Sequence, residues 1–145
     1  MSVQMFRALA VTATLGVMGV SGAVLFARQT PESVFTAEQA TAGRAAYAKH
    51  CASCHMPDLS GNTEIPPLAG AVFIDTWGSR STKDLFDYSA EAMPYGAPSL
   101  SLESYTAITA FILQVNGGVA GSSALTGSTA VPMSSVIAQQ KTPSP

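Results

Sequence analysis

The stretch Cys51-Ala52-Ser53-Cys54-His55 decides how this 145-residue chain is interpreted. The chain has two cysteines, and both lie within these five residues, directly before a histidine. Two intervening residues set the thiols apart to match the two vinyl groups of haem, and the next residue is a histidine that can ligate the iron. The pattern therefore predicts one covalently attached haem c per chain, held by Cys51, Cys54 and His55.

A redox-active dithiol is the alternative interpretation of two cysteines at this spacing. In an oxidising compartment such a pair tends to form a disulfide or to exchange electrons as a dithiol. A thioredoxin-like site needs alternating strands and helices around the cysteines, and the sequence has no sustained period-two alternation. A thiol-disulfide protein without haem is thus the less favoured reading of the motif.

An iron ligated by His55 needs a sixth ligand or has an open position. Five of the six methionines are poor candidates because they lie in the apolar leader, directly after His55 or in the C-terminal tail: Met1, Met5, Met18, Met56 and Met133. Met93 lies 38 residues after His55, in an irregular segment that can wrap around the haem edge. The sequence therefore predicts Met93 as the second axial ligand, against the alternative of an ordinary core methionine. His50 is predicted to be a surface histidine near a helix C-terminus.

Capping residues and apolar periodicity predict an all-α fold. Thr36 with Gln39 forms a capping-box pattern, and Ser81 and Ser101 are further N-cap candidates. The apolar residues Leu85, Phe86 and Tyr88 are expected to face inward from the middle helix. Prolines and glycines make residues 57–70 and 93–99 loops. The predicted helices cover residues 37–49, 82–92 and 102–115, and Asn116-Gly117-Gly118 ends the last one.

Composition sets the domain boundaries. An uncharged run at residues 8–26 follows Arg7, and Ser21-Gly22-Ala23 suits signal peptidase, so residues 1–27 are predicted to be a signal peptide or a membrane anchor. Residues 28–35 are a lead-in linker, residues 36–118 form the single domain, and residues 119–145 are expected to be a flexible, low-complexity tail. The net charge is −2 and the basic residues are scattered, which argues against nucleic-acid binding.

The order of these motifs resembles that of class I cytochromes c over residues 36–117. More narrowly, it is similar to the small mono-haem subunits and domains of periplasmic, quinoprotein-type dehydrogenases. The elements that carry the resemblance are Gly43, Tyr47, CASCH at 51–55, PPLAG at 66–70, Trp77, MPYGAPSLS at 93–101 and YTAITAFILQVNG at 105–117. The resemblance implies a cytochrome c fold, with three to four helices around one haem and long loops.

The resemblance also implies roles for single residues. Glycine is costly inside a helix, so Gly43 already indicates a close backbone crossing. The resemblance assigns this crossing to the last helix, with Tyr47 and either Tyr105 or Phe111 packed around it. It further implies that the carbonyl of Pro67 accepts a hydrogen bond from His55 Nδ1. Trp77 is implied to pack near a haem propionate, with ordinary core packing as an equal and compatible alternative.

These residues predict an electron carrier rather than an enzyme. Two strong axial ligands leave no vacant position on iron, so the expected function is single-electron transfer from a periplasmic dehydrogenase to a further cytochrome or a terminal oxidase. The alternative is a haem enzyme or gas sensor in which the sixth ligand is labile. The expected partners are redox proteins, the expected location is the periplasm, and membrane attachment is expected only if residues 8–26 stay uncleaved.

Overall fold

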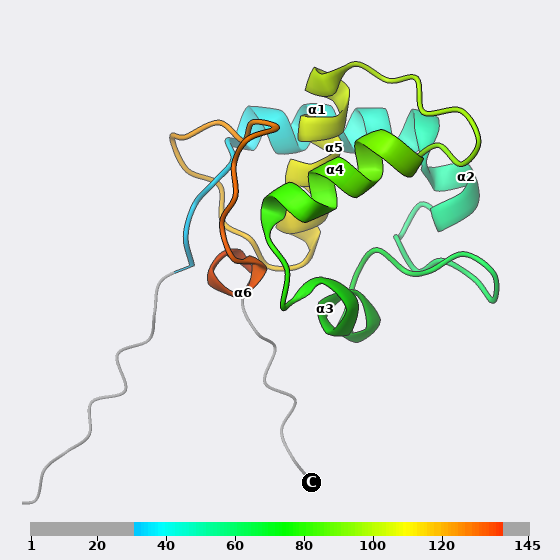
Figure 1. Cartoon of the computed structure of the whole chain (residues 1–145), viewed down its shortest axis with the longest axis horizontal. Coiled ribbons are helices and arrows are strands. Elements are labelled where there is room, and N and C mark those ends of the chain that lie inside the picture. The colour runs from blue at the N-terminus through cyan, green and yellow to red at the C-terminus, as the bar shows by residue number, and fades with distance from the viewer. Residues whose placement is uncertain (1–30, 138–145) are drawn as a thin grey trace, which may run out of the picture.

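The computed structural model describes residues 31–137 and folds them into six helices joined by long loops (Figure 1). The described residues form no strand and contain one isolated bridge, between Ser81 and Pro132. The all-α prediction is therefore confirmed. The helices are α1 (Ala37–His50), α2 (Ala52–His55), α3 (Ala71–Trp77), α4 (Thr82–Ala92), α5 (Leu102–Val115) and α6 (Met133–Val136).

Helices α1 and α5 cross at Gly43 and form the centre of the core. A Cβ atom at Gly43 would lie 1.8 Å from the carbonyl oxygen of Ala107, so only glycine allows the two backbones to approach this closely. The rings of Tyr47 and Phe111 pack beside the crossing with their centroids 5.4 Å apart. The predicted crossing is thus confirmed with Phe111 as the partner of Tyr47, while Tyr105 has a different role.

The three long helices begin where their capping residues predict. The side chain of Thr36 accepts a hydrogen bond from the backbone of Gln39, Ser81 and Asp84 form a second capping box, and Ser101 caps α5. Each satisfies backbone N–H groups that the first helical turn leaves without partners. One detail of α4 differs from the prediction, because the side chain of Tyr88 is 50% exposed rather than turned inward.

Helix α3 was not predicted from the sequence. It follows Gly70, which has a φ of 79° and offers no capping side chain, and it is seven residues long. Its buried residues are Phe73 and Trp77. A short helix without a capping side chain has little local signal, so packing of these two aromatic rings is what stabilises it.

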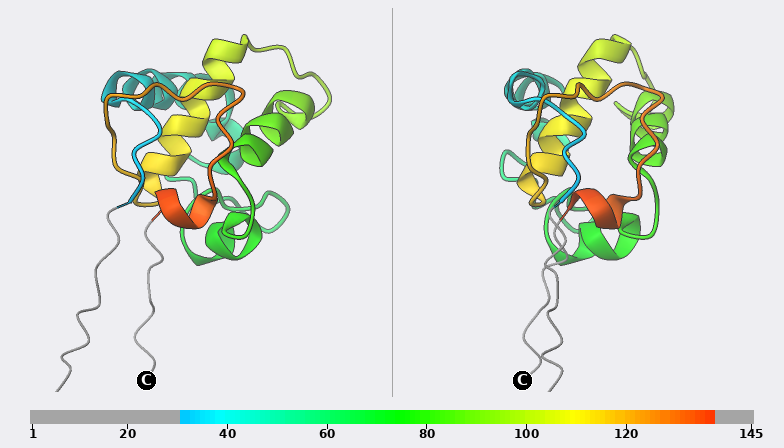
Figure 2. Two further views of the ribbon diagram at one scale, coloured as in Figure 1. Left: turned by 60° about the vertical axis from the view of Figure 1, so that its left-hand side comes forward. Right: turned by 90° about the vertical axis from the view of Figure 1, so that its left-hand side faces the viewer.

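Residues 119–137 differ from the predicted flexible tail. They form an ordered strap that crosses the molecule to α6 (Figure 2). The Gln39 side chain holds the strap at Leu125 through hydrogen bonds of 2.8 and 2.7 Å to its backbone oxygen and nitrogen. The strap also fills the core with side chains that are at most 3% exposed: Leu125, Met133, Val136 and Ile137. A few well-placed apolar residues therefore order a segment whose average composition is polar and small.

The lead-in before α1 also packs on the core. Phe35 is fully buried, and its carbonyl oxygen accepts a hydrogen bond from Gly121 in the strap. The backbone N–H of Glu32 donates to the carbonyl of Ser135 at 2.7 Å, so the two ends of the described chain lie side by side. The predicted signal peptide or anchor at residues 1–27 lies outside the described residues, as do residues 138–145. Within residues 31–137, each helix is too short or too polar to span a bilayer.

Candidate haem-binding site

The two cysteines lie on a single helical turn that continues from α1. The backbone N–H groups of Cys54 and His55 both donate to the carbonyl oxygen of Cys51, at 3.1 and 2.9 Å. Cys51 is half-buried, Cys54 is exposed, and neither takes part in a disulfide. Burial raises the pKa of the Cys51 thiol, and the neighbouring Cys54 thiolate adds to this effect. Both sulfurs are thus free for attachment to a cofactor.

Tyr47 fixes the end of this segment to α1. Its hydroxyl donates to the carbonyl oxygen of Met56 at 2.7 Å and lies 3.2 Å from that of His55. Burial raises the pKa of the Tyr47 phenol to about 12, so the hydroxyl keeps its proton and remains a donor at neutral pH. The side chain that packs at the helix crossing therefore also holds residues 51–55, the predicted haem-binding turn.

His55 is buried and oriented by the loop that follows it. Its Nδ1 lies 2.9 Å from the carbonyl oxygen of Pro66. Because a carbonyl can only accept, Nδ1 carries a proton, and in the neutral imidazole Nε2 then has the lone pair that an iron would need. The predicted acceptor, Pro67, is therefore wrong by one residue. Two adjacent prolines give the same sequence signal, and only the course of the loop decides which carbonyl faces the histidine.

Asn116 holds the Pro66 loop against the end of α5. Its amide nitrogen donates to the carbonyl of Leu68 at 2.9 Å, and its amide oxygen accepts from the N–H of Gly70 at 3.0 Å. The side chain is 4% exposed. The sequence pattern indicates only that Asn116 is part of the stop after the last helix. The signal in the sequence is an asparagine directly after an apolar helix. If such an amide is buried, it needs hydrogen-bond partners.

Met93 stands at the C-terminal end of α4, as the sequence predicts, and its side chain is half-buried. Its backbone N–H donates to Ser89 at 3.1 Å, and its carbonyl oxygen accepts from the hydroxyl of Tyr105 at 2.5 Å. The exposed loop that begins here returns to α5 at Ser101. The ligation of iron by Met93 stays a prediction.

Trp77 packs in an aromatic group at the edge of the core. Its ring lies between those of Phe73 and Tyr88, with centroid distances of 6.5 and 5.5 Å, and the guanidinium of Arg80 lies 4.9 Å from its centre. The indole is 8% exposed. Its place in the core is thus clear, and its contact with a propionate stays a prediction.

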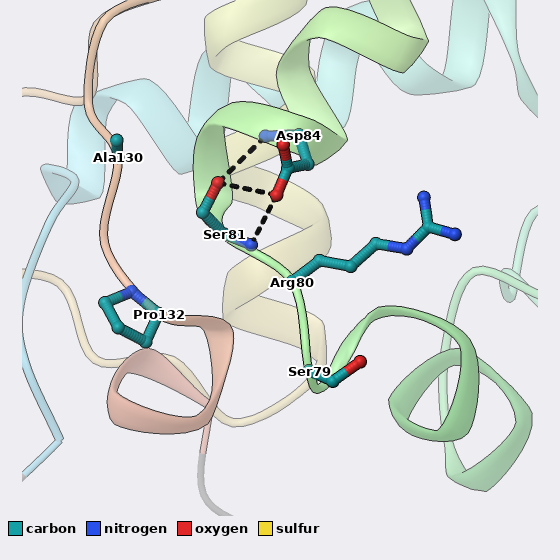
Figure 3. A pocket seen from close by; sticks show the side chains of 6 residues that line it. All are labelled: Ser79, Arg80, Ser81, Asp84, Ala130 and Pro132. Atoms are coloured by element: carbon teal, nitrogen blue, oxygen red, sulfur yellow. Dashed lines mark hydrogen bonds between the residues drawn. The ribbon is translucent and has the colours of Figure 1, made fainter.

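A pocket of about 340 Å³ lies where the start of α4 meets the strap (Figure 3). Figure 3 shows the Ser81–Asp84 capping box on its wall, with Pro132 and Ala130 of the strap opposite. The polar groups of Ser81 and Asp84 hydrogen-bond to each other there. None of the predicted haem-binding residues lines this pocket, so it is separate from the site.

The donor set fits a haem of the c type. Two unpaired cysteines, an adjacent histidine with its Nε2 available, and a methionine after α4 are the groups that such a cofactor uses. Residues 38–112 match the family model described as cytochrome c oxidase, cbb3-type, subunit III. This match covers just over half of the chain and includes Cys51, Cys54, His55 and Met93.

The chain belongs to this family of c-type cytochromes. It is a class I cytochrome, and the family implies haem c as its cofactor and electron transfer as its role. The region that the family model matches ends within α5. Asn116 and the strap of this cytochrome lie beyond it.

A solved structure supports the same assignment. The cytochrome is similar to a chain of the sulfane dehydrogenase SoxCD from Paracoccus pantotrophus, with 31% identity and a TM-score of 0.53. The likeness covers 76% of the cytochrome and 56% of the SoxCD chain, so the cytochrome spans little more than half the length of that chain. No curated protein matches the sequence of the cytochrome.

Proposed function

We propose that this cytochrome carries one haem c, bound covalently through Cys51 and Cys54 and ligated by His55 and Met93, and passes single electrons between redox proteins. The hydrogen bond from His55 Nδ1 to Pro66 carries the proposal, because in the neutral imidazole it leaves the lone pair on Nε2, in a motif with two free thiols. When bound, the haem supplies a one-electron redox centre whose potential the protein sets.

The residues around the site have separate tasks in this proposal. The Pro66 carbonyl orients the His55 ring. The hydrogen bond also makes the imidazole a more basic ligand for the iron. The thioether of Met93 favours the reduced state because it is a soft ligand, so we expect a positive midpoint potential. With His55 and Met93 as ligands, the iron would have no position free for oxygen, which would favour electron transfer over oxygen chemistry.

We further propose that the electron donor is a periplasmic dehydrogenase and that the acceptor is another cytochrome or a terminal oxidase. The similarity to a chain of a sulfane dehydrogenase supports a dehydrogenase as a partner, and the name of the family supports an oxidase. The apolar run at residues 8–26 supports export to the periplasm. The weakly charged surface suits a small, transient contact with such partners.

Covalent attachment is tested on the purified mature protein. A peroxidase stain after a denaturing gel, together with Soret absorption, should show haem that stays with the chain. The Cys51→Ala/Cys54→Ala variant should lose the stained band, because no thioether bond can form. A colourless wild-type protein with two titratable thiols would end the proposal and favour the dithiol alternative.

Ligation by Met93 is tested by Met93→Ala in the haem-loaded protein. The variant should have a lower midpoint potential and should bind carbon monoxide readily when reduced, because it frees one axial position. Met56→Ala is a matched control, since Met56 directly follows His55 and cannot reach the opposite face of the haem. If reduced wild-type protein binds carbon monoxide as fast as Met93→Ala, the sixth ligand is labile and the gas-sensor alternative is favoured.

A further inference from the structure

The loop at residues 93–100 has few contacts of its own to hold Met93 in place. Residues 95–99 are all exposed, and Tyr95 is 93% exposed. Within the loop, the backbone N–H of Ala97 donates to the carbonyl of Pro94 at 3.0 Å. An exposed loop with so little burial is expected to open at low free-energy cost unless another part of the protein holds it.

Tyr105 holds both ends of this loop. Its hydroxyl donates to the carbonyl oxygen of Met93 at 2.5 Å and accepts from the backbone N–H of Leu100 at 3.4 Å. The ring is 4% exposed and lies near the start of α5, which the crossing with α1 fixes in the core. Among residues 31–137, no other side chain hydrogen-bonds to the loop.

We propose that Tyr105 is a positioning residue for the sixth ligand. Its hydroxyl keeps the backbone of Met93 at the end of α4, so that the thioether stays directed at the iron. This inference rests on the proposed ligation by Met93. Tyr105 does not touch the iron; it acts through the loop that carries the ligand.

The effect of losing the hydroxyl follows from the two bonds. In Tyr105→Phe the ring still fills the core, but the carbonyl of Met93 and the N–H of Leu100 lose their partner. A single hydrogen bond of this kind changes an equilibrium by roughly three- to tenfold. The equilibrium in question is between a closed loop, with Met93 on the iron, and an open loop that admits another ligand.

The test is titration of haem-loaded, oxidised protein with imidazole, which competes with Met93 for the iron. Tyr105→Phe should bind imidazole roughly three- to tenfold more tightly than wild type, with a lower midpoint potential. Two control variants remove a hydroxyl but leave the hydrogen bonds from Tyr105 to the loop in place. Thr109→Val removes a buried hydroxyl whose bond stays within α5, to the carbonyl of Tyr105, and Tyr95→Phe removes an exposed one on the loop itself. Both should bind imidazole as wild type does.

A double variant separates positioning from a general loss of stability. Once Met93→Ala has removed the ligand, adding Tyr105→Phe should leave imidazole affinity unchanged, because there is no thioether left to hold. The inference is overturned if Tyr105→Phe binds imidazole like wild type, if Thr109→Val gives an equal gain, or if the two substitutions act additively. If Met93→Ala itself binds imidazole no more tightly than wild type, the ligand assignment fails instead, and the two failures are thereby distinguishable.

Discussion

Single residues set the distances on which the site depends. Gly43 lets α1 and α5 touch backbone to backbone, and Tyr47, one turn further along α1, holds the carbonyls of His55 and Met56. Asn116 performs a similar task at the other end of α5, where it ties down the loop of Pro66. The position of the haem-binding turn thus follows from the helix crossing.

Gly43→Ala should destabilise the protein by at least about 3 kcal/mol, because the added methyl group would meet the backbone of Ala107 rather than a movable side chain. Chemical denaturation followed by circular dichroism measures the effect. Ala45 is exposed on the same helix, so Ala45→Gly should cost only the propensity difference of about 1 kcal/mol. Equal losses in the two variants would show that the crossing is not as close as described.

Asn116→Leu should cost about 1–3 kcal/mol, because the carbonyl of Leu68 and the N–H of Gly70 would lose their partners. The same denaturation experiment measures it. Gln114→Leu makes the same chemical change at an exposed position in the last turn of α5, and it should be nearly neutral. A neutral Asn116→Leu would mean that water replaces the amide and that the loop does not depend on it.

At the scale of elements, helices with a capping side chain behave as the sequence predicts and helices without one do not. The three predicted helices start at their capping residues, and their ends agree with the structure to within one residue. Helices α2, α3 and α6 have four to seven residues and no side-chain cap, and none was predicted. Short helices depend on the tertiary packing of their buried residues. The local sequence gives little indication of that packing.

The cap of α4 should make part of the stability depend on pH. Hydrogen bonds from the backbone and hydroxyl of Ser81 hold the pKa of Asp84 below its ordinary value of 3.8. A carboxyl with a lowered pKa in the folded state stabilises the protein above its unfolded pKa, and this contribution is lost as the pH falls through the folded pKa. Wild type should therefore exceed Asp84→Asn in stability near neutral pH, and the difference should shrink in urea titrations as the pH falls below the ordinary pKa of 3.8. A difference that stays constant with pH would contradict the role of the carboxylate.

At the scale of the whole molecule, the strap completes the core and brings the chain ends together. It contacts the lead-in at Phe35, α1 at Gln39 and α4 at Thr82, whose hydroxyl donates to the carbonyl of Thr129 at 2.7 Å. In Figure 1 the described chain begins and ends beside α6, on the side away from α2. The two ends of the described chain therefore lie on the side of the domain away from the haem-binding turn.

Met133→Ala tests whether the strap belongs to the folding unit. Met133 is fully buried in α6, so the substitution should cost about 2–5 kcal/mol through lost burial and the cavity left behind. Ser134→Ala changes the exposed neighbour in the same turn and should be close to neutral. Thermal unfolding of both variants measures the difference. A small effect of Met133→Ala would indicate that residues 119–137 are a dispensable tail.

Features that depend on near neighbours along the chain could be predicted from the sequence. The Cys51–His55 motif, the caps at Thr36, Ser81 and Ser101, and the unusual glycine at position 43 all carry their physical reason within a few residues. These were enough to predict an all-α cytochrome with a haem-binding turn and three long helices.

Contacts between distant segments follow only from the folded chain. It placed Pro66 rather than Pro67 opposite His55, tied Asn116 to the loop of Leu68, and buried Met133 instead of leaving it in a mobile tail. Each of these depends on how segments tens of residues apart meet in the core. Local propensity and composition do not predict such tertiary contacts. The free energy that stabilises these contacts comes from burial and hydrogen bonding in the complete fold.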